Sequence, residues 1–516
     1  MRRASESELR GRNIIRLRKW EIGEELLGFC ESNLLSEEGL HEIIDRHGLT
    51  HGLTPSHVHD LPPLCQKFGI QYHFFHAACR NERINEGIIR YLLEIFPDAA
   101  SATKYDGMTS LHFACGGNKN VTLGIIQLLI DAAPDSVRAV TNGGFTPLHS
   151  LCDNGKEVDE TAAIQILELL IIKYPDAVQH VDNRGFLPIH FASLWRSPNF
   201  CRVLIEGYPG SERIADATGK GILPLHWACL KNTIPTVEYV YRAYPDAINH
   251  VTSGRQYPIH SAIEGMKHRD NPAAAVETVK FLLDCNSNVK LQSYQGMSLL
   301  LFACLRGNDN SNIETTLQII EVIYDAHPEA VEDDRIASSI HNFHQQVQSF
   351  INRQLVYARQ AQDRALMTTP DDHGRLPLHT ALQNNVRLGS IKLLVKGNPD
   401  AVQSPDNSGA LPLHIACQHH DSVVVVKYLV ELDNVALAAL DRDRNTSLHN
   451  ACLAAKYETI ALLLETYDAV SVSKRNAQGK LSVELLWESD AVEDRESEEY
   501  TDSIFRLLKA YPETLR

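Results

Sequence analysis

The sequence predicts an all-α fold, a solenoid of about ten to eleven helix-turn-helix units with short turns or hairpins between them and one long inserted helix. Two observations predict this fold. The string GFTPLHSLC at residues 144–152 returns with small changes at 107–115, 185–193, 221–229 and 409–417. Its histidine recurs every 34 to 41 residues from His76 to His260 and every 35 from His379 to His449. Such a period is typical of stacked repeats that bury their apolar faces against their neighbours.

The letters of one unit predict two helices and a turn. Thr146 is placed to accept a backbone N–H as the N-cap of a first helix, and Pro147 suits the first helical position. A second helix is expected at 163–173, where Ile164, Leu167, Leu170 and Ile171 lie on one stripe. Tyr174-Pro175 ends that helix, and a polar turn at 182–185 finishes with a glycine that tolerates positive φ.

The motifs TPLHS at 146–150, LPLHWA at 223–228, LPLHTA at 376–381 and LPLHIA at 411–416 carry a resemblance. The chain resembles the ankyrin repeat family, whose T-P-L-H-x-A signature and period extend over about residues 72–516. The resemblance implies an ankyrin-repeat solenoid that binds proteins. Several units depart from the signature, because Leu187, Leu223, Tyr257, Leu376 and Leu411 replace the capping threonine. Those helices are expected to lose a side-chain cap worth about 1 kcal/mol.

Four regions are predicted along the chain. Residues 1–70 carry no repeat, and short helices near 22–32 and 39–45 would form an N-terminal cap or a separate small module behind a basic leader. Residues 71–332 are repeats, including one unit with Leu301 in place of the histidine. Residues 333–369 are an insert. Residues 370–516 are repeats that end in an acidic cap, expected to present a polar outer face.

The insert has apolar residues at helical spacing, which predicts one long amphipathic helix over 336–367. Two interpretations of it are open. The helix is a degenerate repeat or an arm packed on the side of the solenoid, or it offers its apolar stripe to a partner or a second copy.

Composition excludes several classes of protein. The net charge of −16 argues against a nucleic-acid partner, because readers of nucleic acid concentrate basic residues. No apolar run approaches the roughly 18 residues needed to span a membrane. The N-terminus is basic but lacks the apolar stretch of a secretory signal. We therefore expect a cytoplasmic or nuclear monomer with no membrane partner.

Cysteine and histidine are abundant, but their positions point to structural roles. Cys79, Cys115, Cys152, Cys229, Cys304, Cys417 and Cys452 share one position of the unit and are expected to be buried and reduced. Nine motif histidines share another and are expected to bond neighbouring loop backbone. His47, His51, His57 and His59 lack the spacing of a zinc site, which favours a polar loop. No nucleotide-binding or catalytic motif is present, so no cofactor is expected.

The resemblance implies that partners contact the concave face made by the turn tips and the first helices. Large aromatic side chains expected at half-exposed positions there are the candidate anchors: Phe113, Phe191, Trp195, Trp227 and Phe302. Candidates for a polar rim are Tyr105, Asn142, Arg184, Lys220, Arg255, Tyr294 and Arg442. The alternative is that the rings only pack against adjacent turns and that the rim residues are simply solvated.

Three functions are compatible with the sequence. The first is a non-enzymatic scaffold that binds a partner protein through the concave face. The second is an adaptor in which residues 1–70 recruit a catalytic partner such as a ubiquitin ligase while the repeats hold the substrate. The third is an enzyme or metalloprotein that uses the N-terminal histidines, for which the sequence provides no catalytic arrangement.

Overall fold

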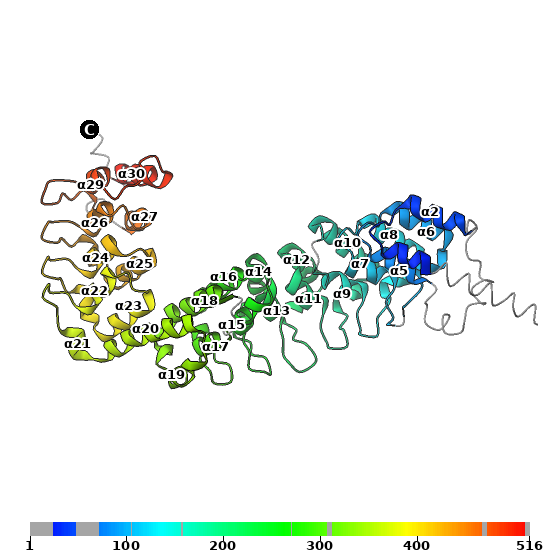
Figure 1. Cartoon of the computed structure of the whole chain (residues 1–516), viewed down its shortest axis with the longest axis horizontal. Coiled ribbons are helices and arrows are strands. Elements are labelled where there is room, and N and C mark those ends of the chain that lie inside the picture. Colours follow the sequence, from blue (N-terminus) through cyan, green and yellow to red (C-terminus); the bar gives the residue numbers. More distant parts are fainter. Residues whose placement is uncertain are drawn as a thin grey trace, which may run out of the picture. The chain divides into compact units, whose positions relative to one another are not determined.

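The computed structural model describes residues 24–47, 72–104, 106–155, 158–269, 271–306, 312–466 and 472–510. Within these ranges the regular structure is helical, apart from one isolated bridge between Thr103 and Thr109, so the all-α prediction is confirmed (Figure 1). The chain divides into two compact units. The first unit comprises 1–289 with 293–295, and the second comprises 290–292 with 296–516.

The first unit contains six repeats, each a pair of helices. Residues 24–31 are helical and α2 follows at Glu37–Arg46. The pairs are α5 (His73–Arg80) with α6 (Glu86–Ile95), α7 (Ser110–Gly117) with α8 (Leu123–Ala132), α9 (Pro147–Cys152) with α10 (Glu160–Lys173), α11 (Pro188–Trp195) with α12 (Pro198–Gly207), α13 (Pro224–Lys231) with α14 (Ile234–Ala243), and α15 (Pro258–Glu264) with α16 (Ala273–Cys285). A short 3₁₀ segment such as Pro175–Gln179 follows most second helices.

The second unit contains five pairs and the insert. The pairs are α17 (Leu299–Arg306) with α18 (Ile313–Ala326), α22 (Pro377–Gln383) with α23 (Leu388–Gly397), α24 (Pro412–His419) with α25 (Val423–Leu432), α26 (Ser447–Leu453) with α27 (Tyr457–Thr466), and α29 (Ser482–Glu488) with α30 (Glu498–Ala510). The insert holds α19 (Asp334–Ser339), α20 (Gln345–Gln362) and α21 (Arg364–Thr368). The expectation of ten to eleven units is met.

Successive repeats stack in two layers. In the first unit, first helices pack on first helices from α5 through α15, and second helices pack on second helices from α6 through α16. The turns that precede the first helices, which we call fingers, project on the side of the first-helix layer (Figure 1). Backbone hydrogen bonds join neighbouring fingers, as from Asn183 N–H to the Gly143 carbonyl (3.0 Å).

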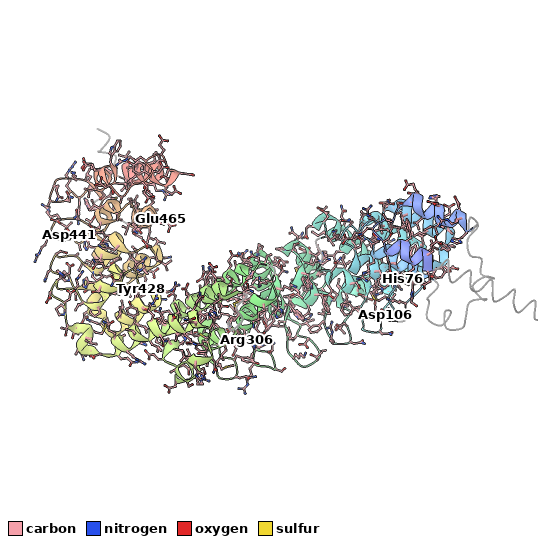
Figure 2. All side chains as sticks on the ribbon, in the orientation of Figure 1. His76, Asp106, Arg306, Tyr428, Asp441 and Glu465 are labelled. Carbon is pink, nitrogen blue, oxygen red and sulfur yellow. The ribbon has the colours of Figure 1, made fainter. Side chains whose placement is uncertain are left out.

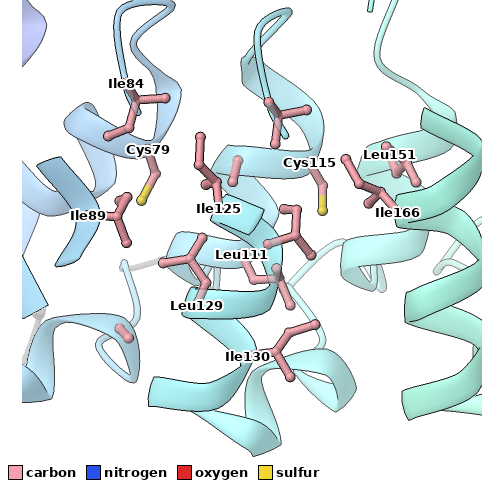
Figure 3. Packing of buried hydrophobic residues seen from close by; sticks show 14 of the residues in the cluster. Cys79, Ile84, Ile89, Leu111, Cys115, Ile125, Leu129, Ile130, Leu151 and Ile166 are labelled. Carbon is pink, nitrogen blue, oxygen red and sulfur yellow. The ribbon is translucent and has the colours of Figure 1, made fainter. Parts of the chain in front are cut away.

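The core lies between the two layers. The repeated cysteines are fully buried and reduced, as expected, beside aliphatic side chains of the second helices. Cys115 and Leu111 of α7 are buried with Ile125 and Leu129 of α8 (Figure 3). Burying one such aliphatic side chain stabilises the fold by about 1.5 to 3 kcal/mol. Because similar packing recurs in successive repeats, the core of the first unit follows the stack of its repeats.

The first helices are capped by two different routes. The Thr146 hydroxyl accepts the N–H of His149, as predicted. Where leucine or tyrosine replaces threonine, that side-chain cap is missing, also as predicted. The motif histidine still accepts the N-cap backbone N–H there, for example from Leu187 to His190 Nδ1 at 3.0 Å. One orphan donor of these helices is therefore satisfied without a threonine.

In the first unit, hydrogen bonds from asparagine and arginine side chains join each repeat to the one before it; we call this the ladder of polar side chains. The Asn118 amide donates to the carbonyls of Cys79 and Asn81, and the Asn154 amide donates to the carbonyls of Cys115 and Asn118. Asn232 repeats this pattern, while buried Arg196 and Arg269 reach the carbonyls of Leu151 and Cys229. These carbonyls at or just after first-helix ends would otherwise be unsatisfied.

Residues 24–47 continue the same ladder. The Asn81 amide donates to the carbonyls of Cys30 and Ser32, both at 2.8 Å. Leu26, Leu40 and Ile44 are buried in the core that they share with the first repeat. The two short helices expected here are present, and the described part of the N-terminal region packs as a degenerate repeat that covers the end of the array.

The prediction of one continuous helix over 336–367 is wrong. The segment is divided into α19, a 3₁₀ turn at Ile340–Asn342, α20 and α21. Phe343 has extended backbone (φ −84°, ψ 156°), and the His344 and Asp363 side chains cap the two helices that follow. The sequence pattern suggested one continuous helix because apolar Ile336 and Phe343 are seven residues apart, close to two turns of an α-helix. Both side chains are buried, but the backbone between them is not continuously helical.

The apolar stripe of α20 is used within the chain. The helix packs on α23 and the 3₁₀ segment Pro328–Glu332 and buries Val347, Ile351 and Ala358. A buried polar chain reinforces the contact: the Tyr324 hydroxyl bonds Ser390 Oγ at 2.9 Å, and Ser390 Oγ donates to Gln354 Oε1 at 2.7 Å. The insert is therefore an arm packed against the second helices of its own unit.

The last repeat exposes two large aromatic side chains as well as acidic ones. Glu484 takes the place of the motif histidine and accepts the Leu481 N–H at 2.6 Å. Trp487 stands where other repeats have the buried cysteine and is 63% exposed, and Phe505 of α30 is 64% exposed. The acidic residues predicted for 488–499 are present, but they flank exposed aromatic surface.

Candidate partner-binding face

Motif histidines in the first helices hold the fingers of the next repeat. Nδ1 of His149 accepts the Thr146 N–H, so its Nε2 carries the proton and donates to the Phe186 carbonyl (3.2 Å). His112 holds the Phe145 carbonyl in the same way at 3.0 Å. The prediction that these histidines bond loop backbone is confirmed for seven of the nine, whose Nε2 atoms bond backbone carbonyls: His76, His112, His149, His190, His379, His414 and His449.

Burial keeps these histidines neutral. Desolvation lowers the pKa of His112 and of His149 to about 4, although each ring bonds a backbone carbonyl that favours the charged form. At neutral pH the rings are uncharged, with one nitrogen accepting and the other donating. Two finger phenylalanines, Phe145 and Phe186, are positioned by neutral imidazoles.

Four aromatic rings from three repeats meet where the fingers join the first helices. Phe191 of α11 lies 5.1 Å from Phe145 and 5.9 Å from Phe186, centroid to centroid. Phe186 meets the edge of Trp227 of α13 at 5.6 Å. The Arg184 guanidinium lies 5.3 to 5.8 Å from the centroids of the three phenylalanines. We call these five residues the aromatic cluster.

A second aromatic contact lies one helical turn farther along the same helices. The Lys231 ammonium is 3.8 Å from the centroid of the Trp195 ring, a close cation–π contact. On another side of the ring lies Gly155, where a Cβ atom would come within 3.0 Å of the indole. Trp195 and Lys231 are both half-buried, so part of this pair faces solvent.

The cluster and the Trp195 pair form one surface. Trp195 follows Phe191 by four residues on α11, and Lys231 follows Trp227 by four on α13, so each pair lies on one helix face. Because α11 and α13 are neighbours, the two pairs lie side by side. We call this surface, with the fingers of the first unit above it, the finger–helix face.

Phe113 lies apart from the aromatic cluster, at the N-terminal end of the unit. It stacks on His76, which Figure 2 labels in this part of the chain. The two ring centroids are 5.2 Å apart, and the Lys104 ammonium lies 5.6 Å from the Phe113 ring. The ring lines a pocket of about 600 Å³ together with Cys30, His73 and Arg80. Phe113 is half-buried, so part of the ring faces the pocket.

Two of the five predicted anchors are not half-exposed. Phe191 is 6% exposed, because the finger rings Phe145 and Phe186 pack on it. Phe302 is only 1% exposed, and the Arg306 guanidinium lies 4.9 Å from its ring. Their rings pack, as the alternative interpretation held. Phe302 also belongs to the second unit. Trp195, Trp227 and Phe113 are half-buried and can still contact a partner.

The polar candidates are dispersed along the fingers. Arg184, Lys220, Arg255 and Asn142 are exposed in the first unit, and Arg442 is exposed in the second. Tyr294 is half-buried, with its ring 5.9 Å from His260. Tyr105 lies outside the described residues. The structure therefore joins only Arg184 directly to the aromatic cluster.

Phe145, Phe186 and Lys231 are members of this surface that the sequence did not identify. Phe145 and Phe186 follow the finger glycine in GFTPLH and GFLPIH, so their signal was visible as part of the repeat. No sequence signal near Lys231 indicates its cation–π contact, because its partner Trp195 belongs to the previous repeat.

No metal centre or reactive thiol emerges from the described ranges. They contain no group of three or more potential metal ligands. His47 bonds the Glu25 carboxylate at 2.7 Å, and the other histidines of its predicted cluster lie outside the described residues. Burial raises the pKa of Cys115 and Cys229 to about 12, which disfavours the thiolate. None of the described helices is long and apolar enough to cross a membrane.

Comparison with known proteins agrees with this geometry. No curated protein matches the chain. The family model for ankyrin repeats in three copies matches residues 74–177 in the first unit and 378–476 in the second. These segments cover α5 to α10 and α22 to α27. With one matched array in each unit, the chain carries ankyrin repeats in both units.

Proposed function

We propose that this protein is a non-enzymatic scaffold that binds a partner protein through the finger–helix face of the first unit. Ankyrin repeats generally mediate protein–protein interactions, which supports the class of function. The location of the binding site is proposed from one observation: half-buried Trp195 and Trp227 lie on neighbouring first helices. Rigid aromatic side chains of this kind supply much contact area at little entropic cost.

The aromatic cluster favours binding by a preformed surface. Phe186 packs against the Trp227 ring and against Phe191, which in turn packs on Phe145. Motif histidines hold the two finger phenylalanines in place. A partner would meet a surface that is already ordered, so less conformational entropy is lost on association.

The adaptor hypothesis receives less support. Residues 24–47 bury their apolar side chains in the core of the first repeat and bond Asn81 through their carbonyls. This part of the N-terminal region acts as the end of the array. Recruitment of a ubiquitin ligase would have to use other residues of 1–70.

The test is quantitative affinity capture from lysate with Trp195→Ala/Trp227→Ala and with Trp487→Ala as the matched control. Trp487 is more exposed than the other two but lies in the last repeat of the second unit. We expect the double variant to lose its specific partners at least tenfold and Trp487→Ala to keep them. All proteins must melt at similar temperatures. Equal capture by the double variant and the wild type would refute the location.

A further inference from the structure

The fingers of the first unit show a separation of charge between buried and exposed side chains. Five fingers, at 104–108, 141–145, 182–186, 216–222 and 252–256, carry three acidic and four basic residues. Asp182 and Asp216 are buried, whereas Arg184, Lys220 and Arg255 are exposed. The exposed side chains of the fingers therefore carry a more positive net charge than all finger residues counted together.

Two of the three acidic residues, Asp182 and Asp216, are buried because the turns use them. Asp182 Oδ1 accepts the backbone N–H groups of Arg184 (2.9 Å) and Phe186 (2.8 Å), and its side chain is 0% exposed. Asp216 Oδ1 accepts the Ile222 N–H at 2.6 Å. A carboxylate that closes a turn in this way has little capacity left for a partner.

The cations of three of these fingers remain exposed. The Arg184 side chain is 56% exposed although Nε bonds Asp182. Within the described ranges no carboxylate lies in ion-pair distance of Lys220 or Arg255. Their two fingers are joined by a hydrogen bond from the Ser253 N–H to the Lys220 carbonyl (2.8 Å). Three successive fingers thus each expose one cation.

Arg255 occupies a position that the turn would fill better with glycine. Its φ is 61°, in the left-handed region, where the equivalent residues of the preceding fingers are Gly107, Gly144, Gly185 and Gly221 with φ between 71° and 84°. A side chain in this region is strained, and such strain often persists where a function requires the residue. The exposed cation is the one property that arginine adds here.

The opposite side of the unit has the opposite sign. The second helices α6, α8, α10, α12, α14 and α16 carry nine acidic and five basic residues. In a chain of net charge −16, the fingers above Trp195 and Trp227 form a local positive region. Lys231, over the Trp195 ring, adds another cation to the same face.

We propose that the partner segment bound by the finger–helix face is acidic and carries bulky apolar side chains. Its carboxylates pair with Arg184, Lys220, Arg255 and Lys231, and its apolar side chains cover Trp195 and Trp227. Complementary charge would accelerate association and reject basic or neutral competitors. The inference rests on the proposed function, because it names the chemistry of the ligand for that site.

The test is selection of binders from a random dodecapeptide library displayed on phage, with the full chain as the target. We expect the selected peptides to be rich in Asp and Glu around aromatic or aliphatic residues. Lys220→Glu/Arg255→Glu should weaken their affinity at least tenfold. Lys173→Glu/Lys280→Glu is the matched control, since it makes the same charge change at exposed positions of α10 and α16. Circular dichroism melts verify that every variant is folded.

Other outcomes separate the two proposals. If the selected peptides are neutral or basic, or if the two charge-reversal variants bind alike, the acidic partner is refuted. The proposed function still stands if Trp195→Ala/Trp227→Ala no longer binds those peptides. If that variant still binds them, both the proposed function and the acidic partner are refuted. A single-stranded oligonucleotide that binds more tightly than the best peptide would also overturn the inference, because it would indicate a general polyanion site.

Discussion

The first and second units use the same helix pair but present different faces. In the first unit, the position after the motif histidine holds Phe113, Phe191 and Trp227, and Trp195 follows one turn later. In the second unit the corresponding residues are Thr380, Ile415 and Asn450, and buried Phe302 is the aromatic exception. The comparison teaches that the repeat determines the scaffold, while the few residues it leaves free determine which side chains each unit exposes.

The units also differ in how they are held together. The ladder of polar side chains from Asn81 to Arg269 runs through the first unit. In the second unit the insert helix α20 packs across α23 with the buried Tyr324–Ser390–Gln354 chain. Stability in the first unit is spread evenly over repeats, and in the second it includes one irregular contact. Three perturbations test this difference, in order of decreasing effect.

The largest effect is expected from a charge in either core. Leu225 and Leu413 are 0% and 2% exposed at equivalent positions of α13 and α24. Leu225→Asp should destabilise the first unit and Leu413→Asp the second, each by at least about 4 kcal/mol, because an unpaired buried carboxylate is strongly unfavourable. Hydrogen exchange read by mass spectrometry reports which unit loses protection.

Ile172→Asp serves as the control for these variants, since Ile172 is 74% exposed on α10. It should leave exchange unchanged. Wild-type protection in Leu225→Asp or Leu413→Asp would show that the repeat register described above is wrong.

Acid should affect the first unit more than the second. Burial lowers the pKa of the motif histidines His76, His112, His149, His190 and His260 to about 4 and that of His226 to about 3. The second unit has three such residues, His379, His414 and His449, also with a lowered pKa. Because the unfolded chain binds protons from about pH 6.5 and the folded chain does not, stability falls as pH drops from about 6.5 to 4.

Hydrogen exchange at several pH values, corrected for the intrinsic rate at each, measures this effect. The first unit should lose protection at a higher pH than the second. If both units lose protection together, or if protection is constant down to pH 4, neutral motif histidines do not hold the fingers as described.

The smallest effect is expected from the polar chain beneath the insert. Tyr324→Phe removes the hydroxyl that bonds Ser390, at a cost of about 1 kcal/mol, and should increase exchange in α18, α20 and α23 only. Tyr428→Phe is the control, because the structure shows no hydrogen bond from its half-buried hydroxyl. A change in the first unit after Tyr324→Phe would contradict the assignment of this contact to the second unit.

Short-range features were predictable from the sequence because they depend on residues close in the chain. The Thr146 cap, the absent caps at the leucine positions and the histidine bonds to loop backbone all follow from one repeat and its neighbour. The buried cysteines follow from periodicity. These are consequences of helix geometry, which each unit obeys in the same way.

The tertiary structure decided which side chains are exposed and which distant ones meet. Phe191 and Trp227 occupy the same position of the repeat, yet the first is 6% exposed and the second half-buried, because the rings that reach them come from other repeats. The break in the insert was hidden because apolar spacing continued through it. The sequence by itself determined how each repeat folds. Which surface is left for a partner was decided only by packing between repeats, because the exposure of a side chain depends on the residues packed around it and not on its residue type alone.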